Sequence, residues 1–164
     1  MFTLPQPIVA SEFIQVRFLK ALRDAQHMSD DPDTQMTAII LSKCKKKKIT
    51  KANTVPLGVL KDPERLIRPE KYHWIEHAER NCIYSAAGYG LPLKGATMFT
   101  LCMPCIDCAR GIACSGLKRL YIDYDFTSTY IDGNAAQWEE GFKRVFALLE
   151  EAGVEVAFLT SQTD

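Results

Sequence analysis

Along the chain, the spacing of hydrophobic residues is typical of a helix in some segments and of a strand in others. Apolar residues recur every three to four positions from Val9 to Leu22, which predicts a first helix over about residues 8–27. Two apolar runs, 36–42 and 49–54, predict strands. They are joined through residues 43–48, whose five lysines cannot be buried together and must lie on a solvated turn.

In the second half of the chain, expected helices alternate with expected strands. Residues 55–74 carry three prolines without periodicity, which predicts a long ordered loop. Helices are then expected over 77–87, 105–115 and 135–153, alternating with strands over 96–102, 117–123 and 154–159. Because a helical crossover between strands makes them parallel, the expected fold is α/β: a three-layer α/β/α arrangement around one five-stranded mixed sheet.

Composition limits the classes of partner. With 164 residues and 47% apolar content, the chain is expected to form one domain over residues 1–164. Twenty basic and twenty acidic residues cancel, so neither duplex nucleic acid nor an anionic membrane is an expected partner. Without interleaved aromatic residues, the lysine run favours a solvated turn over a nucleic-acid patch.

The cysteines and the absence of long apolar runs indicate the compartment. No segment approaches the ~18 apolar residues of a membrane span, and the N-terminal residues lack a secretory pattern. We therefore expect a soluble cytoplasmic protein. Six cysteines in such a protein, two of them in C-x-x-C, favour metal binding or free thiols over disulfides.

Two short motifs carry candidate chemistry. Cys105 and Cys108 follow Pro104 at the expected start of a helix, where one helical turn brings both sulfurs to the same side. The helix N-terminus favours thiolates, the form that binds zinc. His77 opens another expected helix and provides a third ligand. A set of three protein ligands is typical of a catalytic zinc site, which keeps a position for a water whose pKa falls to about 7.

Glu79 lies two residues after His77, so we expect it outside the metal's ligand set. A carboxylate there can take a proton from water and pass it to a ring nitrogen and a leaving amine. The combination of H-x-E with P-C-x-x-C is the signature of zinc-dependent nucleobase deaminases. Hydrolytic deamination with Zn²⁺ as cofactor is therefore the expected reaction, and Glu79 is the candidate catalytic residue.

Among these enzymes, the chain resembles the deoxycytidylate deaminase family over about residues 30–123, through "DPDTQMTAII", "NTVP", "HAERN", "PCIDCARGI" and "SGLKRL". The resemblance implies a cytidine-deaminase-like fold, conversion of dCMP to dUMP and ammonia, and a homo-oligomer. Asn53 matches the family's sugar-contacting asparagine. The backbone of Ala78 is a further substrate-binding candidate, and Arg110 is a candidate for a substrate or subunit contact.

The substrate remains open within this class. Family members that bind a monophosphate tend to carry a tyrosine followed by a basic residue after the strand corresponding to 117–123, but no Lys, Arg or His lies here between Arg119 and Lys143. Donors for a phosphate would have to come from elsewhere, and the candidates are Lys51, Arg68, Lys71 and Arg110. A free nucleoside, a base or a modified cytosine derivative is the alternative to dCMP.

Two other classes of protein stay open. A tRNA adenosine deaminase shares the zinc signature but usually needs a basic face for its RNA. A non-catalytic, zinc-stabilised binding module normally closes its metal site with four protein ligands, and Glu79 would then have no evident task.

Overall fold

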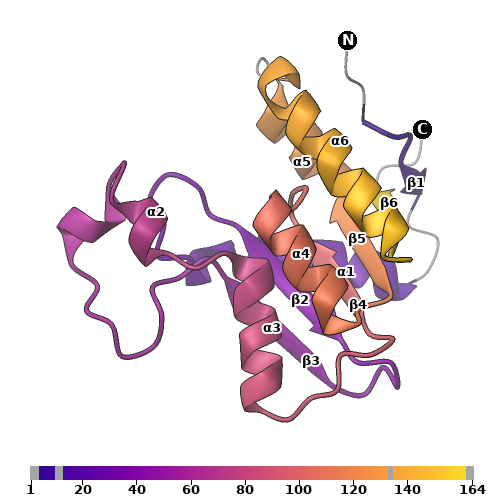
Figure 1. The fold of residues 1–164 in the computed structure, drawn as a ribbon, viewed down its shortest axis with the longest axis horizontal. Coiled ribbons are helices and arrows are strands. Elements are labelled where there is room, and N and C mark those ends of the chain that lie inside the picture. The colour runs from indigo at the N-terminus through magenta and orange to yellow at the C-terminus, as the bar shows by residue number, and fades with distance from the viewer. Residues whose placement is uncertain (1–3, 10–12, 133–134, 162–164) are drawn as a thin grey trace.

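The computed structural model describes residues 4–9, 13–132 and 135–161. Its helices and strands follow the alternating order expected from the sequence (Figure 1). In chain order they are β1 (Ile8–Val9), α1 (Phe13–Asp24), β2 (Thr37–Leu41), β3 (Lys48–Ala52), α2 (Lys71–Trp74), α3 (Ala78–Gly88), β4 (Thr97–Thr100), α4 (Ile106–Ser115), β5 (Arg119–Asp123), α5 (Tyr124–Ile131), α6 (Ala135–Glu151) and β6 (Glu155–Thr160). Two short 3₁₀ turns cover Ala25–Met28 and Pro63–Leu66.

The strands form one mixed sheet in the order β1-β6-β5-β4-β2-β3. Strands β4, β5, β6 and β1 pair in parallel, whereas β2 is antiparallel to both β4 and β3. The prediction of a mixed α/β sheet with helical crossovers is therefore confirmed. The expected strand count of five is wrong, because Ile8 and Val9, assigned to the first helix, pair with β6 as a sixth strand.

Helices cover both faces of the sheet, which confirms the three-layer arrangement (Figure 1). Alternate residues of each strand face opposite sides. On one face, Ile39 and Phe99 pack with Leu19 and Leu22 of α1. On the other face lies the larger core, under α3, α4 and α6, with members including Ala38, Met98, Ile122, Cys82, Ile112 and Val145. Helices α3 and α4 on this second face start at the candidate motifs.

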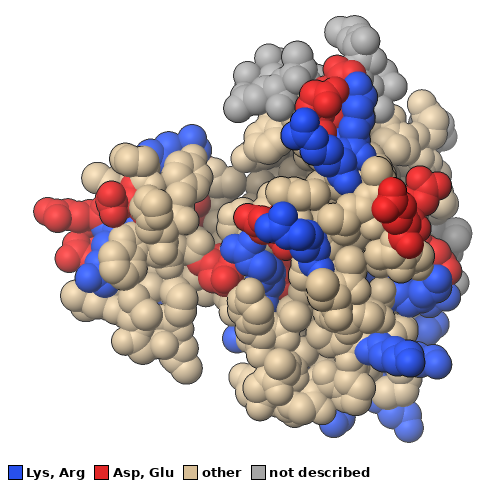
Figure 2. Space-filling model, viewed as in Figure 1, with Lys and Arg blue, Asp and Glu red and all other residues tan. Residues whose placement is uncertain are grey.

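Two other segments differ from the sequence expectation. The loop expected over residues 55–74 contains the 3₁₀ turn and α2, and backbone hydrogen bonds between Thr54 and Glu76 close its base at 2.9 and 3.1 Å. We call residues 55–75 the arm, and Figure 2 shows it as a lobe that projects from the body of the protein. Helix α5 was not expected; the Asp123 side chain caps its start by accepting a hydrogen bond from the N–H of Phe126.

The lysine run lies where the sequence placed it. Residues 43–48 are all exposed; residues 43–47 form the turn between β2 and β3, and Lys48 begins β3. Lys45 adopts a positive φ of 59°, and its N–H donates to the carbonyl of Ser42 at 2.8 Å.

None of the described helices is both long enough and apolar enough to cross a lipid bilayer.

Candidate active site

The structure brings His77, Cys105 and Cys108 together from two helix starts. His77 is the residue before the first turn of α3, and Cys105 holds the same position in α4. Cys108 follows within the first turn of α4, where it is buried. Both helices start at the end of the sheet where β4 finishes, because the Leu101–Pro104 segment leads directly from β4 into α4. The fold thereby converts two distant motifs into one cluster.

The cluster has dimensions that suit a tetrahedral metal ion. Nδ1 of His77 lies 3.5 Å from the sulfur of Cys105 and 3.5 Å from the sulfur of Cys108. The three ligand atoms all lie within 4.8 Å of one another. Tetrahedral zinc with Zn–S bonds of about 2.3 Å and Zn–N bonds of about 2.0–2.1 Å requires nitrogen and sulfur about 3.6 Å apart. The donor set and its spacing therefore fit zinc.

The electrostatics of the cluster favour a thiolate. Hydrogen bonds from Cys108 and His77 lower the pKa of Cys105 to about 3. The same contact with Cys105 raises the pKa of His77. Arg80, one turn into α3, is held by Glu76 and places Nη1 3.9 Å from the sulfur of Cys108. A fixed cation beside these sulfurs stabilises negative charge on them.

Glu79 lies in the first turn of α3 and is buried, with 8% of its surface exposed. Burial raises the pKa of its carboxyl group, so Glu79 binds a proton more readily than an exposed glutamate does. Ala78 is the first residue of the same helix, where backbone N–H groups have no partner inside the helix. Both residues line one pocket together with His77 and Cys105 of the metal-ligand cluster.

The pocket has a volume of about 630 Å³, which is enough for a small molecule the size of a nucleotide. His77, Ala78 and Glu79 form one side, and the Thr100–Ile106 segment contributes Thr100 and residues 102–106 to another. Helix α6 adds a stripe at helical spacing, and the arm and the segment before β2 complete the lining. These further residues include Trp138, Gly141, Phe142, Val145, Asp31, Thr34, Arg68, Lys71, Tyr72 and Ile75.

Asn53 lines the pocket, but its amide mainly holds neighbouring backbone. Its Oδ1 accepts hydrogen bonds from Ser29 Oγ at 2.6 Å and from the N–H of Met36 at 2.9 Å. Its Nδ2 donates to the carbonyl of Thr34 at 2.8 Å. An amide nitrogen has two N–H groups, and the second has no partner among the described residues. Asn53 therefore shapes this wall of the pocket, whatever else it binds.

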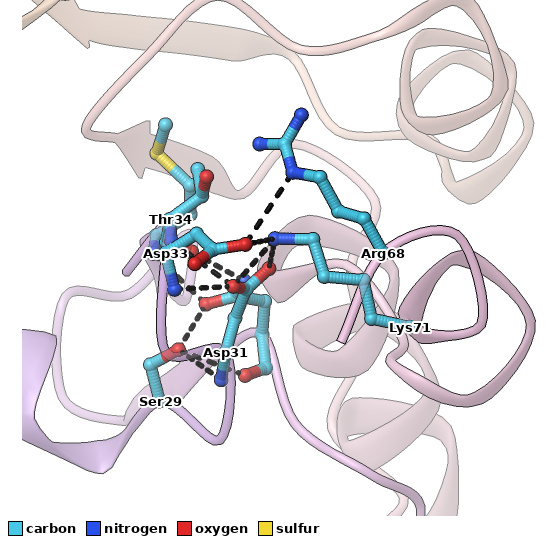
Figure 3. A network of polar contacts seen from close by, with 8 residues as sticks. Ser29, Asp31, Asp33, Thr34, Arg68 and Lys71 are labelled. Atoms are coloured by element: carbon cyan, nitrogen blue, oxygen red, sulfur yellow. Dashed lines mark hydrogen bonds and ion pairs between the residues drawn. The ribbon is translucent and has the colours of Figure 1, made fainter. Parts of the chain in front are cut away.

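A buried lysine joins the arm to this wall (Figure 3). Lys71 is 2% exposed, and its Nζ lies 2.7 and 3.0 Å from the two carboxylate oxygens of Asp31 and 3.0 Å from Asp33. Burial alone would lower the pKa of Lys71, but hydrogen bonds to the two aspartates outweigh it and raise the pKa. Asp31 also accepts from the N–H groups of Asp33 and Thr34. We call Asp31, Asp33 and Lys71 the Lys71 cluster.

Of the basic residues considered from the sequence, Arg68 and Lys71 line the pocket. Lys51 and Arg110 do not, and Arg110 instead pairs with Asp107 on the surface of α4. Arg144 of α6 does line the pocket, although the sequence analysis did not single it out. Arg144 lies one helical turn after Gly141. It is next to the apolar residues of α6 whose spacing in the sequence indicates only core packing.

None of the six cysteines is paired in a disulfide in the structure. Cys82 is fully buried, and Cys114 at the other end of α4 from the site is exposed.

Two curated relatives of the chain are deaminases by name. The deoxycytidylate deaminase of Enterobacteria phage T2 is 41% identical over 80 residues, which cover 49% of this chain and 36% of the phage protein. This chain therefore spans about a third of that relative's length. An uncharacterised deaminase encoded in the luxG 3′ region of Aliivibrio fischeri is 29% identical over 145 residues, covering 87% of this chain and 91% of the relative.

A solved structure and a family model agree with these relatives. The structure of dCMP deaminase from cyanophage S-TIM5, in complex with dCMP and dUMP, aligns with a TM-score of 0.65 at 21% identity and covers 88% of this chain and 96% of that one. At this identity the likeness concerns the fold. Residues 12–123 match the model of the cytidine and deoxycytidylate deaminase zinc-binding region, and this chain belongs to that family.

Proposed function

We propose that this chain binds zinc and hydrolyses the bond between the ring and the exocyclic amino group of a cytosine nucleotide. The first candidate substrate is dCMP, with dUMP and ammonia as products. The observation that carries the proposal is the convergence of His77, Cys105 and Cys108 into one cluster, of which His77 and Cys105 line the same pocket as buried Glu79. Structural zinc sites usually close with four protein ligands. A set of three beside a buried carboxylate favours catalysis over a binding module.

The roles of the residues follow from their positions. His77, Cys105 and Cys108 would hold zinc, which when bound supplies the Lewis acidity that activates a water molecule for attack. Glu79 accepts a proton from this water and delivers it to the ring nitrogen beside the reacting carbon. Glu79 then takes the remaining proton of the hydroxyl group added to the ring carbon and passes it to the departing amine, so that water and cytosine give uracil and ammonia. The N–H of Ala78 would donate a hydrogen bond to the ring carbonyl.

A nucleotide is favoured because cations line the same pocket as Glu79. Among the described residues, the ion pair of Arg68 is with Asp33 through Nε, at 3.3 Å between two exposed groups, so its terminal nitrogens can serve a ligand. Arg144 has no ion pair with any residue in the described ranges. A phosphate needs charge-assisted donors, and Arg68 and Arg144 would provide them from the arm and from α6. The deaminase relatives named above are consistent with this class of substrate.

The test compares ammonia release from dCMP, deoxycytidine and free cytosine by the zinc-loaded protein. We expect the highest catalytic efficiency on dCMP. Equal or higher efficiency on the nucleoside or the base would remove nucleotide specificity and leave a cytosine deaminase. Absence of ammonia from all three substrates, with zinc bound, would refute the proposed reaction.

A further inference from the structure

Thr100 lines the pocket, and its hydroxyl group is buried without a partner. Thr100 is the last residue of β4 and is 1% exposed. Its Oγ1 makes no hydrogen bond with any residue in the part of the chain that the structure describes. Buried polar groups are almost always paired, and the other buried threonines obey this rule. Thr37 donates to the carbonyl of Leu22 at 2.8 Å, and Thr127 donates to the carbonyl of Leu101 at 3.2 Å.

The strand geometry explains why Thr100 has no polar neighbour on the sheet. Side chains alternate along β4, so Thr100 faces the same side as Met98, under α3, α4 and α6. Its partners on the adjacent strands are Ala38 and Ile122, which belong to the apolar core on that face. Thr100 also lines the pocket with Glu79. The pocket is therefore the place where its hydroxyl can find a partner.

We propose that the hydroxyl of Thr100 hydrogen-bonds a polar atom of the bound base, and that Thr100 is a specificity-determining residue. This inference rests on the proposed function, because it assigns a role within the same pocket. A hydroxyl can both donate and accept, so it fits a ring carbonyl, ring nitrogen or amino group.

The proposal predicts opposite effects on stability and binding. Thr100→Val keeps the shape and the β-branched side chain but removes the unpaired hydroxyl. We expect the Tm of the ligand-free protein to rise by about 2–4 °C, while calorimetry shows dUMP binding weakened by about tenfold. Thr100→Ser keeps the hydroxyl and loses a methyl group. Its Tm should fall, and its affinity for dUMP should stay within about twofold of the wild type.

A purely structural threonine would give the reverse pattern for Thr100→Val, with lower Tm and unchanged affinity, and this result would overturn the proposal. If Thr100→Val does not fold, Thr100→Ala and Thr100→Ser form a second matched pair that differs by the hydroxyl alone. Equal dUMP affinity in that pair would also overturn it.

Both measurements use the zinc-loaded protein and need no turnover. If Thr100→Val binds dUMP as tightly as the wild type does, the role of Thr100 is refuted and the proposed function stands. Wild-type protein that binds neither dUMP nor deoxyuridine would refute the proposed function, and the inference with it.

Discussion

Glu79 is a buried carboxyl group two residues after a proposed metal ligand, and its pKa is raised by burial. Replacing it by glutamine preserves the shape and removes the proton-carrying group. We expect Glu79→Gln to keep its fold and its zinc but to lose turnover by about 10²–10⁴-fold, the usual contribution of a general acid-base group. Steady-state ammonia release and metal analysis of the same sample test this. Glu150→Gln, an exposed change on α6, is the control, and near wild-type turnover in Glu79→Gln would remove Glu79 from the mechanism.

Cys105 and Cys114 provide a matched pair on α4. Cys105 belongs to the metal-ligand cluster, whereas Cys114 is exposed near the end of the helix. We expect Cys105→Ser to hold much less zinc than the wild type, because a neutral hydroxyl replaces a thiolate ligand. Cys114→Ser should retain one zinc per chain. Elemental analysis after gel filtration measures both, and full zinc retention in Cys105→Ser would show that the proposed ligand set is wrong.

The sequence indicated some pocket residues and not others, for a physical reason. Two short motifs contain His77, Glu79, Cys105 and Cys108. The spacing within each motif already requires a shared helix turn or helix start. Arg144 and Thr100 enter the pocket only because α6 and β4 pack beside those helices. Their local sequences resemble an ordinary helix stripe and an ordinary strand. No local pattern distinguishes such residues before the tertiary structure is known.

The same distinction applies to whole elements. The central strand β2 is buried at all five positions, so its continuous apolar run was recognisable. Strand β1 has two residues, and only its long-range pairing with β6 separates it from the helical pattern that follows. Helix α5 is rich in aromatic and β-branched residues, which disfavour helices. Its capping by Asp123 and its packing against β5 and β6 outweigh that preference.

The arm depends on the Lys71 cluster, which joins α2 to the segment before β2. Lys71→Met keeps the apolar part of the side chain but leaves the buried Asp31 carboxylate without its cation. Breaking a buried pair in this way costs about 3–5 kcal/mol of unfolding free energy. Lys61→Met is the control, because Lys61 is 57% exposed and pairs with Asp30 at the surface, where a pair contributes about 0–1 kcal/mol. Urea unfolding measures both, and equal small losses would show that the Lys71 cluster does not hold the arm.

Helix α6 carries a prediction about the phosphate. Arg144 lines the pocket, whereas its neighbour Lys143 pairs with Glu139 at 2.8 Å and does not line it. We expect Arg144→Gln to raise KM for dCMP by about 10–100-fold, as the loss of a charge-assisted hydrogen bond should. KM for deoxycytidine should not change, and Lys143→Gln should affect neither substrate. An equal effect of Arg144→Gln on both substrates would show that Arg144 does not bind the phosphate.

At the scale of the whole molecule, the arm both completes the pocket and leaves apolar surface exposed. Arg68, Lys71, Tyr72 and Ile75 contribute to the pocket lining. Leu57 is fully exposed at 104%, and Leu60, Ile67 and Tyr72 are 58–68% exposed. Exposed apolar patches on a projecting segment are typical of protein interfaces. The arm is therefore the part of the surface that we expect to pack against a second copy of the chain, in the homo-oligomer that the family resemblance implies.

This expectation can be tested by changing the arm without touching the pocket. Leu57 and Leu60 do not line the pocket, and burying a leucine stabilises an interface by about 1.5–3 kcal/mol. Light scattering at micromolar concentration should give a multiple of the 18.5 kDa chain mass for the wild type. The Leu57→Asp, Leu60→Asp double variant should shift toward the monomer, because two carboxylates would be buried at the contact. Val16→Asp changes an exposed apolar residue on α1, away from the arm, and should keep the wild-type mass. A monomeric wild type would refute the oligomer, and an oligomeric double variant would place the interface outside the arm.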